Sequence, residues 1–389
     1  MPSHYDVIVV GCGITGATTA HFLKALGTGR VLLVERGQPA SGGTGKSAAV
    51  VRQHYSTALM ARLARESIGI FRDLESELGV TGVFTNSGYV MLVPPDLMAP
   101  ATANLERQRS VGVVTDFLPR EAWEERLPWL ATDGVAGVIH EPDGGYADPI
   151  RSTEGFVETF RRAGGEVRLR TPVRELLREG DRVTGILLDE GPVLADVVVN
   201  AAGPWAVPLA RSARIEMPMR TVREQDTIWQ ARPGRPIPTT SVSNAVDAIY
   251  MVPQGEDRIL IGRGFPKDYY DVDAYNYKET LDDDFVSVVL ERAVRRVSGL
   301  EGMRLVHGYA ALYDVTPDWY PFIGPRSGLS GYVDACGGSG HGFKIGPAIG
   351  RELARWIHSG EVASDFAGLS HDRIAAGRLF AGAYGGNRG

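Results

Sequence analysis

The chain has few cysteines and no long apolar run, and both absences limit what it can be. Two cysteines among 389 residues cannot form a disulfide framework, which favours a reducing compartment. Uninterrupted apolar runs stay well short of the roughly 18 residues that a membrane span needs. The chain enters a strand-like run at residues 6–10, so we expect no signal peptide. Together these features predict a cytoplasmic protein without a membrane span.

Other functional classes lack their signatures as well. The net charge is −6 and no Lys/Arg block occurs, so we expect no nucleic-acid partner. The eight histidines show no HxxxH spacing, and no metal site is expected. No GxSxG motif or Cys–His arrangement marks a covalent nucleophile. The length predicts two or three domains.

What the chain does have is a glycine turn near its start. Residues 6–10 form a buried strand pattern, a helical pattern covers residues 17–26, and a second strand pattern ends at Glu35. Gly11 permits the tight turn, Gly13 lets a pyrophosphate approach the backbone, and Gly16 lets helix and strand pack closely. The helix start favours phosphate, and Glu35 is placed to accept from a ribose hydroxyl. We predict dinucleotide binding here; a ligand-free βα turn is the alternative.

A polar loop at residues 39–47 follows the acid-bearing strand. Its glycine spacing is not that of a Walker loop, but Thr44, Lys46 and Ser47 could donate to a pyrophosphate or ribityl chain. Arg52 comes shortly after and is either a surface cation or a site residue. His54 either orients Arg52, lines a pocket or packs in the interior.

Two later segments repeat the strand-to-small-residue pattern. One is an apolar strand at residues 193–200 that runs into Ala201-Ala-Gly-Pro-Trp205; the other is a strand at 331–335 that meets the glycine-rich segment 336–347, with a helix expected from Ala348. β-type segments between residues 217 and 261 separate these units. The pattern predicts an α/β fold, a Rossmann-like doubly wound domain with an inserted antiparallel β-sheet domain.

With all these turns in view, the chain resembles the D-amino acid oxidase-like family of FAD-dependent oxidoreductases, in its sarcosine oxidase and dimethylglycine dehydrogenase branch. The matching segments are Gly11–Gly16 with Glu35-Arg36, Thr44–Ser47 leading to Arg52–Tyr55, Asn200–Trp205 and Gly338–Lys344. The resemblance implies a domain of residues 1–84, 145–215 and 310–389 that binds FAD, and a substrate domain of residues 85–144 and 216–309. The residues expected to hold FAD are Gly11, Gly13, Ile14, Thr15, Gly16, Glu35, Arg36, Thr44, Gly45, Lys46, Ser47, Val173, Ala202, Gly203, Trp205, Gly338, Gly340, His341, Gly342, Phe343 and Lys344.

The resemblance also implies a substrate pocket. Arg52 and Lys344 match residues that hold a substrate carboxylate, and Tyr250 and Tyr313 match tyrosines of the same pocket, with His54 beside them. Two paired cations suit a carboxylate in a partly dry site, because Arg offers a bidentate fork. Without that match, Lys344 would be a solvated lysine, and Tyr250 an ordinary strand aromatic.

Two positions depart from sarcosine oxidases. Ala311 stands where those enzymes attach FAD to a cysteine, so we expect non-covalent FAD. Leu260 stands where they carry an oxygen-activating lysine, although Arg258 or Arg263 could reach the site. The electron acceptor is therefore either oxygen or a partner protein.

The expected function is oxidation of the C–N bond of a small amino acid or N-alkyl amino acid. Hydride would pass to flavin N5, and the imine would then hydrolyse. One alternative is a primary amino acid oxidase, acting on glycine or a D-amino acid and releasing ammonia. Another is an FAD-carrying, non-catalytic or electron-relay subunit of a larger complex. Whether the chain forms an oligomer is open.

Overall fold

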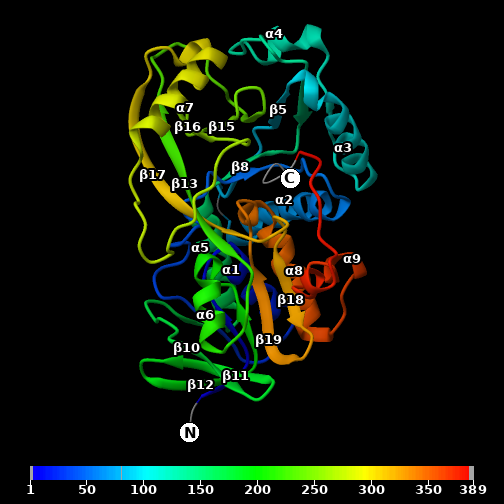
Figure 1. The fold of residues 1–389 in the computed structure, drawn as a ribbon, viewed down its shortest axis with the longest axis vertical. Coiled ribbons are helices and arrows are strands. Elements are labelled where there is room, and N and C mark those ends of the chain that lie inside the picture. Colours follow the sequence, from blue (N-terminus) through cyan, green and yellow to red (C-terminus); the bar gives the residue numbers. More distant parts are fainter. Residues whose placement is uncertain (1–2, 80, 385–389) are drawn as a thin grey trace.

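The computed structural model describes residues 3–79 and 81–384, which form two sheet-based lobes (Figure 1). The first sheet has eight strands in the order β10-β11-β19-β12-β1-β2-β9, with β18 paired to β19. Its parallel part consists of β9 (Glu166–Arg168), β2 (Val31–Val34), β1 (His4–Val10), β12 (Gly191–Asn200) and β19 (Leu329–Cys336). The strands β10 (Glu175–Glu179) and β18 (Phe322–Arg326) pair antiparallel with β11 (Arg182–Leu188) and β19, respectively, and β11 pairs antiparallel with β12 but parallel with β19.

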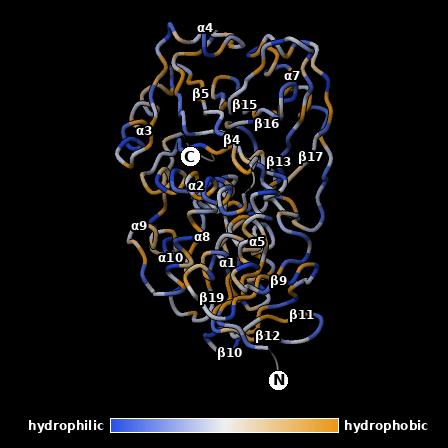
Figure 2. Tube along the Cα trace, turned by 180° about the vertical axis from the view of Figure 1, so that it is seen from behind, coloured by the Kyte–Doolittle hydropathy of each residue, from blue (hydrophilic) through white to orange (hydrophobic). Residues whose placement is uncertain are grey.

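Apolar side chains cover both faces of this sheet, as a parallel sheet requires. On one face pack α1 (Ile14–Ala25), α2 (Ala58–Leu78), α5 (Pro149–Arg162) and α8 (Gly342–Ser359). On the other face lies α6 (Ala206–Ser212), which packs in one apolar cluster with side chains of β10, β11 and the other strands. In Figure 2 the apolar segments gather in the interior of this lobe, around α1 and β19. The arrangement agrees with the predicted doubly wound domain.

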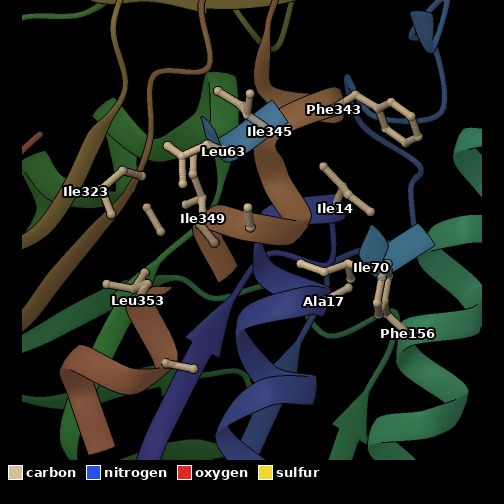
Figure 3. Close-up of a cluster of buried hydrophobic side chains, with 14 of the residues drawn as sticks. Ile14, Ala17, Leu63, Ile70, Phe156, Ile323, Phe343, Ile345, Ile349 and Leu353 are labelled. Atoms are coloured by element: carbon tan, nitrogen blue, oxygen red, sulfur yellow. The ribbon is translucent and has the colours of Figure 1, made fainter. Parts of the chain in front are cut away.

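Among the described helices of this lobe, α1 and α8 share the most extensive contact. In Figure 3, Ile14 and Ala17 of α1 lie beside Ile345 and Ile349 of α8. Gly350 of α8 allows the approach, because a Cβ there would overlap the Thr18 hydroxyl. That hydroxyl donates to the carbonyl of Gly346 at 3.1 Å. The first and last glycine turns of the chain are thereby held side by side.

The second sheet also has eight strands, in the order β17-β13-β16-β15-β14-β5-β7-β6. Most of its pairs are antiparallel, and α7 packs against it. A small third sheet joins β3, β8 and β4. The remaining bounds are β3 (Val50–Val51), β4 (Phe84–Thr85), β5 (Tyr89–Val93), α3 (Met98–Ser110), β6 (Asp116–Phe117), α4 (Trp123–Arg126), β7 (Gly137–Glu141), β8 (Gly145–Ala147), β13 (Arg220–Gln230), β14 (Ser241–Asn244), β15 (Ile249–Pro253), β16 (Arg258–Arg263), α7 (Asp283–Arg296), β17 (Arg304–Val315), α9 (Ser364–Ala367) and α10 (Asp372–Ala375), with 3-10 turns at Pro95–Leu97, Arg120–Ala122, Gly203–Trp205 and Ser298–Leu300.

Two boundaries differ from those expected. Helix α8 begins at Gly342 rather than Ala348, so Lys344 lies inside its first turn. Glycine and proline obscured this start, although a helix tolerates Gly where packing holds the backbone. Strand β17 continues to Val315, past residue 309, where we placed the end of the substrate domain. Within the described residues, no helix is long and apolar enough to cross a bilayer.

A buried ion pair ties the C-terminal region to the last glycine turn. Arg373 is 2% exposed and donates to Asp318 from both Nε and Nη2, each at 2.8 Å. Asp318 lies in the same loop as Thr316, whose backbone N–H donates to the Ser339 hydroxyl at 3.2 Å. Ser339 belongs to the turn that precedes α8. The Arg373–Asp318 ion pair therefore stabilises the loop that contacts the turn before α8, the helix that carries Lys344.

Replacing Arg373 should destabilise the fold strongly. Arg373→Ala leaves the Asp318 carboxylate buried without its cation, a change that typically costs about 3–5 kcal/mol. Urea unfolding followed by circular dichroism would measure the loss. The control is Arg174→Ala, which removes an equally bidentate but exposed pair with Asp189 and should leave the midpoint unchanged. Equal midpoints for the two variants would contradict this role.

Candidate functional site

A cavity of about 710 Å³ lies where the two large sheets meet. Its floor is formed by the residues that follow the carboxyl ends of β1, β2, β12 and β19. Its other walls come from β13, β15, β16 and β17 of the second sheet. A crevice at the carboxyl ends of parallel strands is the usual ligand site of such sheets.

The first glycine turn opens the floor of the cavity. Gly11 has φ +105°, and a Cβ there would overlap the carbonyl of Ala201. Gly13 precedes α1 and lines the cavity beside Ile14 and Thr15. Gly16 lies behind the lining, where a Cβ would overlap the carbonyl of Gly11. The turn thus leaves backbone facing the cavity at the start of a 12-residue helix.

Glu35 and Arg36 form one end of the cavity. The Glu35 carboxylate accepts from Cys12 N at 2.9 Å and from Gly37 N at 2.7 Å, which fixes its orientation. The Arg36 guanidinium lies 3.8 Å from the ring of Trp205 and 5.8 Å from the ring of Tyr275. Tyr275 was not among the expected residues. This end therefore combines a fixed carboxylate with a stacked cation.

The loop at residues 41–49 forms one long side. The Thr44 hydroxyl accepts from Ile14 N at 3.1 Å, and the Ser47 hydroxyl accepts from Ala49 N at 3.0 Å. Lys46 also lines the cavity, but its ammonium donates to Glu279 at 2.6 Å and to the Tyr277 hydroxyl at 3.0 Å. Gly45 lies outside the lining. A role for the Lys46 charge toward a pyrophosphate would require these bonds to break.

The small-residue turns after β12 and β19 complete the floor. Ala202, Gly203 and Trp205 line the cavity, as does Val173. After β19, Gly340 has φ +81°, and a Cβ there would overlap the Tyr313 ring. The other expected residues that line the cavity in this last turn are Gly338, His341, Gly342, Phe343 and Lys344.

Arg52 and Lys344 are brought to the same cavity from distant parts of the chain. Arg52 follows β3 and is 8% exposed, whereas Lys344 lies in the first turn of α8 and is 7% exposed. The Arg52 guanidinium lies 4.8 Å from the Tyr55 ring and donates to the carbonyl of His54. Burial, with the nearby Arg52 charge, lowers the pKa of the Lys344 ammonium well below its usual range. A bound anion at this position would offset both the burial of the Lys344 ammonium and its repulsion by Arg52.

His54 does not line the cavity. It lies behind Arg52, where Nε2 is 3.0 Å from the Tyr384 hydroxyl and Nδ1 is 3.1 Å from Gln108 Nε2. Burial and Arg52 lower the pKa of His54 to about 3, which keeps the imidazole neutral. The geometry therefore supports the packing alternative for His54. Tyr250 and Tyr313, in contrast, both line the cavity.

Charged residues occupy the wall formed by the second sheet, and its two acids, Glu224 and Asp226, were not indicated by the motifs. Glu224, Asp226 and Arg263 line the cavity, and Lys267 donates to Glu224 at 2.5 Å from a nearly buried position. The sequence did carry one signal for Glu224 and Asp226, because two acids at alternate positions of a strand lie on the same face of the sheet. Arg263, rather than Leu260, lines the cavity in the strand where sarcosine oxidases carry the oxygen-activating lysine. Ala311 lines it too.

Comparison with known proteins identifies the family. The profile described as "FAD dependent oxidoreductase" matches residues 6–356. The chain belongs to this family of FAD-dependent oxidoreductases. The match confirms the family and the cofactor FAD that the glycine turns indicated.

Similar proteins agree with this assignment. The chain is 28% identical over 384 residues to 4-methylaminobutanoate oxidase (formaldehyde-forming) of Paenarthrobacter nicotinovorans, which covers 96% of the chain and 46% of that protein. It is 26% identical to the mitochondrial sarcosine dehydrogenase of Homo sapiens, covering 96% and 42%. The chain thus spans less than half the length of these two relatives. The crystal structure of L-proline dehydrogenase from P. horikoshii superposes with a TM-score of 0.89 at 26% identity, covering 98% of this chain and 100% of that one.

The residues of the cavity fit FAD. Gly11 and Gly340 line the cavity with backbone alone, and no side chain can replace them because a Cβ would overlap the Ala201 carbonyl or the Tyr313 ring. The fixed Glu35 carboxylate suits ribose hydroxyls, and the α1 start suits the pyrophosphate. The expected residues that line the cavity are thus placed to hold this group, whereas Gly16 and Gly45 lie outside the lining and pack against the carbonyls of Gly11 and Ala40.

Removing the Glu35 carboxylate should weaken FAD binding in this family member. A hydrogen bond to a charged group contributes about 1.5–3 kcal/mol, so Glu35→Ala should raise the FAD dissociation constant roughly 10- to 100-fold. Titration of the apoprotein, followed by quenching of flavin fluorescence, would measure it. Glu179→Ala removes an exposed acid on β10 and serves as the control. Unchanged affinity in Glu35→Ala would refute the ribose contact.

Proposed function

We propose that the chain oxidises the C–N bond of a small amino acid, preferably an N-alkyl amino acid, with non-covalently bound FAD. The proposal rests chiefly on one observation. Two buried cations, Arg52 and Lys344, line the same cavity as the FAD-type glycine turns. A carboxylate-bearing substrate is the ligand that such a pair is suited to hold.

The chain's own residues would perform the binding and orientation. Arg52 offers a planar fork of N–H donors to the substrate carboxylate. Lys344 offers a single ammonium group, and the carboxylate would stabilise the protonated form of this lysine. Tyr250 and Tyr313 border the remainder of the substrate and reduce its contact with water. FAD supplies the hydride acceptor when it is bound. The imine product would then hydrolyse to a carbonyl compound and an amine.

The names of the relatives support the same class of substrate. They refer to 4-methylaminobutanoate, sarcosine and L-proline, which each combine a carboxylate with a secondary amine. A primary amino acid substrate is the closest alternative. It would release ammonia instead of a dealkylated amine.

Anaerobic titration tests the function directly. The purified, FAD-loaded chain is mixed with N-methyl, cyclic and primary amino acids, and flavin absorbance is followed before and after oxygen is admitted. We expect bleaching by secondary amino acids. Rapid return of colour in air identifies an oxidase, and slow return a dehydrogenase. No bleaching by any amine would contradict the proposal and favour a structural or electron-relaying role for FAD.

Arg52→Ala should weaken substrate binding while leaving the flavin spectrum intact. Truncating one partner of a buried charge pair costs about 2–5 kcal/mol, so the substrate dissociation constant should rise about 30-fold or more. It is obtained from the dependence of the flavin reduction rate on substrate concentration. Arg211→Ala, at an exposed site on α6, is the control. Loss of bound flavin in Arg52→Ala would instead assign Arg52 to the cofactor.

A further inference from the structure

The wall of the cavity opposite the glycine turns carries two buried acids with different partners. Glu224 and Asp226 are alternate residues of β13, and they are 8% and 6% exposed. Glu224 accepts from the ammonium of Lys267 at 2.5 Å, which compensates its charge. Asp226 accepts instead from the neutral hydroxyl of Tyr250, also at 2.5 Å. Burying a carboxylate that is hydrogen-bonded only to a neutral phenol costs free energy of folding, which suggests a functional role for Asp226.

The sheet register brings Asp226 and Tyr250 together. Gly262 of β16 pairs with Asp226 on one side and with Tyr250 of β15 on the other, so the three residues form one row across the sheet. Figure 1 shows these strands side by side in the same lobe. A Cβ at Gly262 would overlap both the Asp226 carboxylate and the Tyr250 hydroxyl. The glycine thus leaves the space in which the acid and the phenol meet.

This contact determines what Tyr250 can offer to a ligand. A tyrosine hydroxyl has one proton, and Tyr250 directs it to Asp226. The side chain of Tyr313 also hydrogen-bonds this oxygen, which leaves one lone pair of the Tyr250 hydroxyl for a ligand in the cavity. The hydroxyl is therefore an acceptor with respect to the cavity, suited to an N–H donor. Arg52 and Lys344, which line the same cavity, are suited to the carboxylate.

Several charged or titratable groups face Asp226. They are Glu224 on its own strand, Lys267 from the segment after β16, Tyr250 on β15, and Tyr309 and Tyr313 on β17. Burial raises the pKa of Asp226 to about 6, while the bond from Tyr250 and the charge of Lys267 lower it and Glu224 raises it. The carboxylate is thus ionised near neutral pH, yet is more basic than an ordinary aspartate.

We propose that Asp226 and Tyr250 form the amine subsite of the cavity and take up the proton of the substrate ammonium. The ammonium N–H proton passes to the Tyr250 oxygen as the hydroxyl proton of Tyr250 passes to Asp226. The products are a neutral amine, a neutral tyrosine and a protonated Asp226, and no electrons are transferred. The freed lone pair on nitrogen then assists loss of hydride from the adjacent carbon. This inference rests on the proposed amine oxidation, and it assigns Tyr250 the contact and Asp226 the role of proton acceptor.

The test is the pH dependence of flavin reduction in Asp226→Asn. The amide keeps an acceptor for the Tyr250 hydroxyl but cannot take a proton. General-base catalysis is worth about 10²- to 10⁴-fold, so the rate divided by the dissociation constant should fall roughly 100-fold or more at pH 7. The deficit should shrink as the pH approaches the ammonium pKa of about 10, because free neutral amine then becomes available. Tyr250→Phe should show a similar loss.

A matched control and a binding comparison separate this role from a structural one. Asp257→Asn changes an exposed acid on the hairpin beside β16, and should leave the pH profile unchanged. Methoxyacetate has the carboxylate of N-methylglycine but an ether in place of the amine, and its affinity is read from the shift of flavin absorbance. Asp226→Asn should bind methoxyacetate as the wild type does, but should lose affinity for N-methylglycine. Equal loss for both ligands, or a wild-type pH profile, would overturn the proposal.

Failure of the function itself would give a different result. If no amine bleaches the wild-type flavin, the oxidation is refuted, but the two ligands can still be compared by absorbance. The amine subsite would still be supported if the wild type binds N-methylglycine about tenfold more tightly than methoxyacetate and Asp226→Asn loses this preference. No preference in the wild type would refute the subsite as well.

Discussion

The structure depends on the shared direction of β1, β2, β12 and β19. Because these strands run parallel, their carboxyl ends meet at one edge of the sheet, and each is followed there by small residues or by Glu35. Segments more than 300 residues apart in the sequence are therefore neighbours in space, as the bond between Thr18 and Gly346 demonstrates. Helices α1 and α8 are held closely by the glycines of α8, so the starts of both helices face one cavity. The site follows from the topology before any individual side chain is considered.

The second sheet supplies what glycine turns cannot, namely side chains with defined charge. Its wall contributes Glu224, Asp226 and Arg263 to the cavity, and the two acids are buried. Such charges are tolerated when each has a partner, and Lys267 fulfils this for Glu224. The charge of Lys344 faces Arg52 instead, and its lowered pKa reflects that burial and repulsion. The cavity therefore carries groups of both signs, which suits a ligand that bears both charges.

The sequence allowed the glycine turns to be predicted because their constraint is local. Gly11 and Gly13 stand at fixed offsets between a strand and a helix, and the same reasoning applied to Gly338 and Gly340. Asp226 could not be found in this way, since its role requires Gly262 and Tyr250 on two other strands. The partners of Lys46 were also hidden, because Glu279 is more than 200 residues away. The domain boundaries and the surroundings of His54 could not be predicted either, because both depend on contacts between residues far apart in the sequence.

The floor of the cavity and the wall formed by the second sheet differ in how strongly the fold constrains their residues. Around Gly11 and Gly340 the requirement is for backbone space, and any side chain would overlap existing atoms. At the wall that we propose for the substrate, the requirements fall on the side chains of Tyr250, Asp226 and Arg263, which lie on the strands β15, β13 and β16. A family built in this way can keep one cofactor while its members change substrate. The relatives agree, since proteins named for different amines share both the family and most of this chain's length. Substrate identity in this chain must therefore be sought on β13, β15 and β16 rather than in the glycine turns.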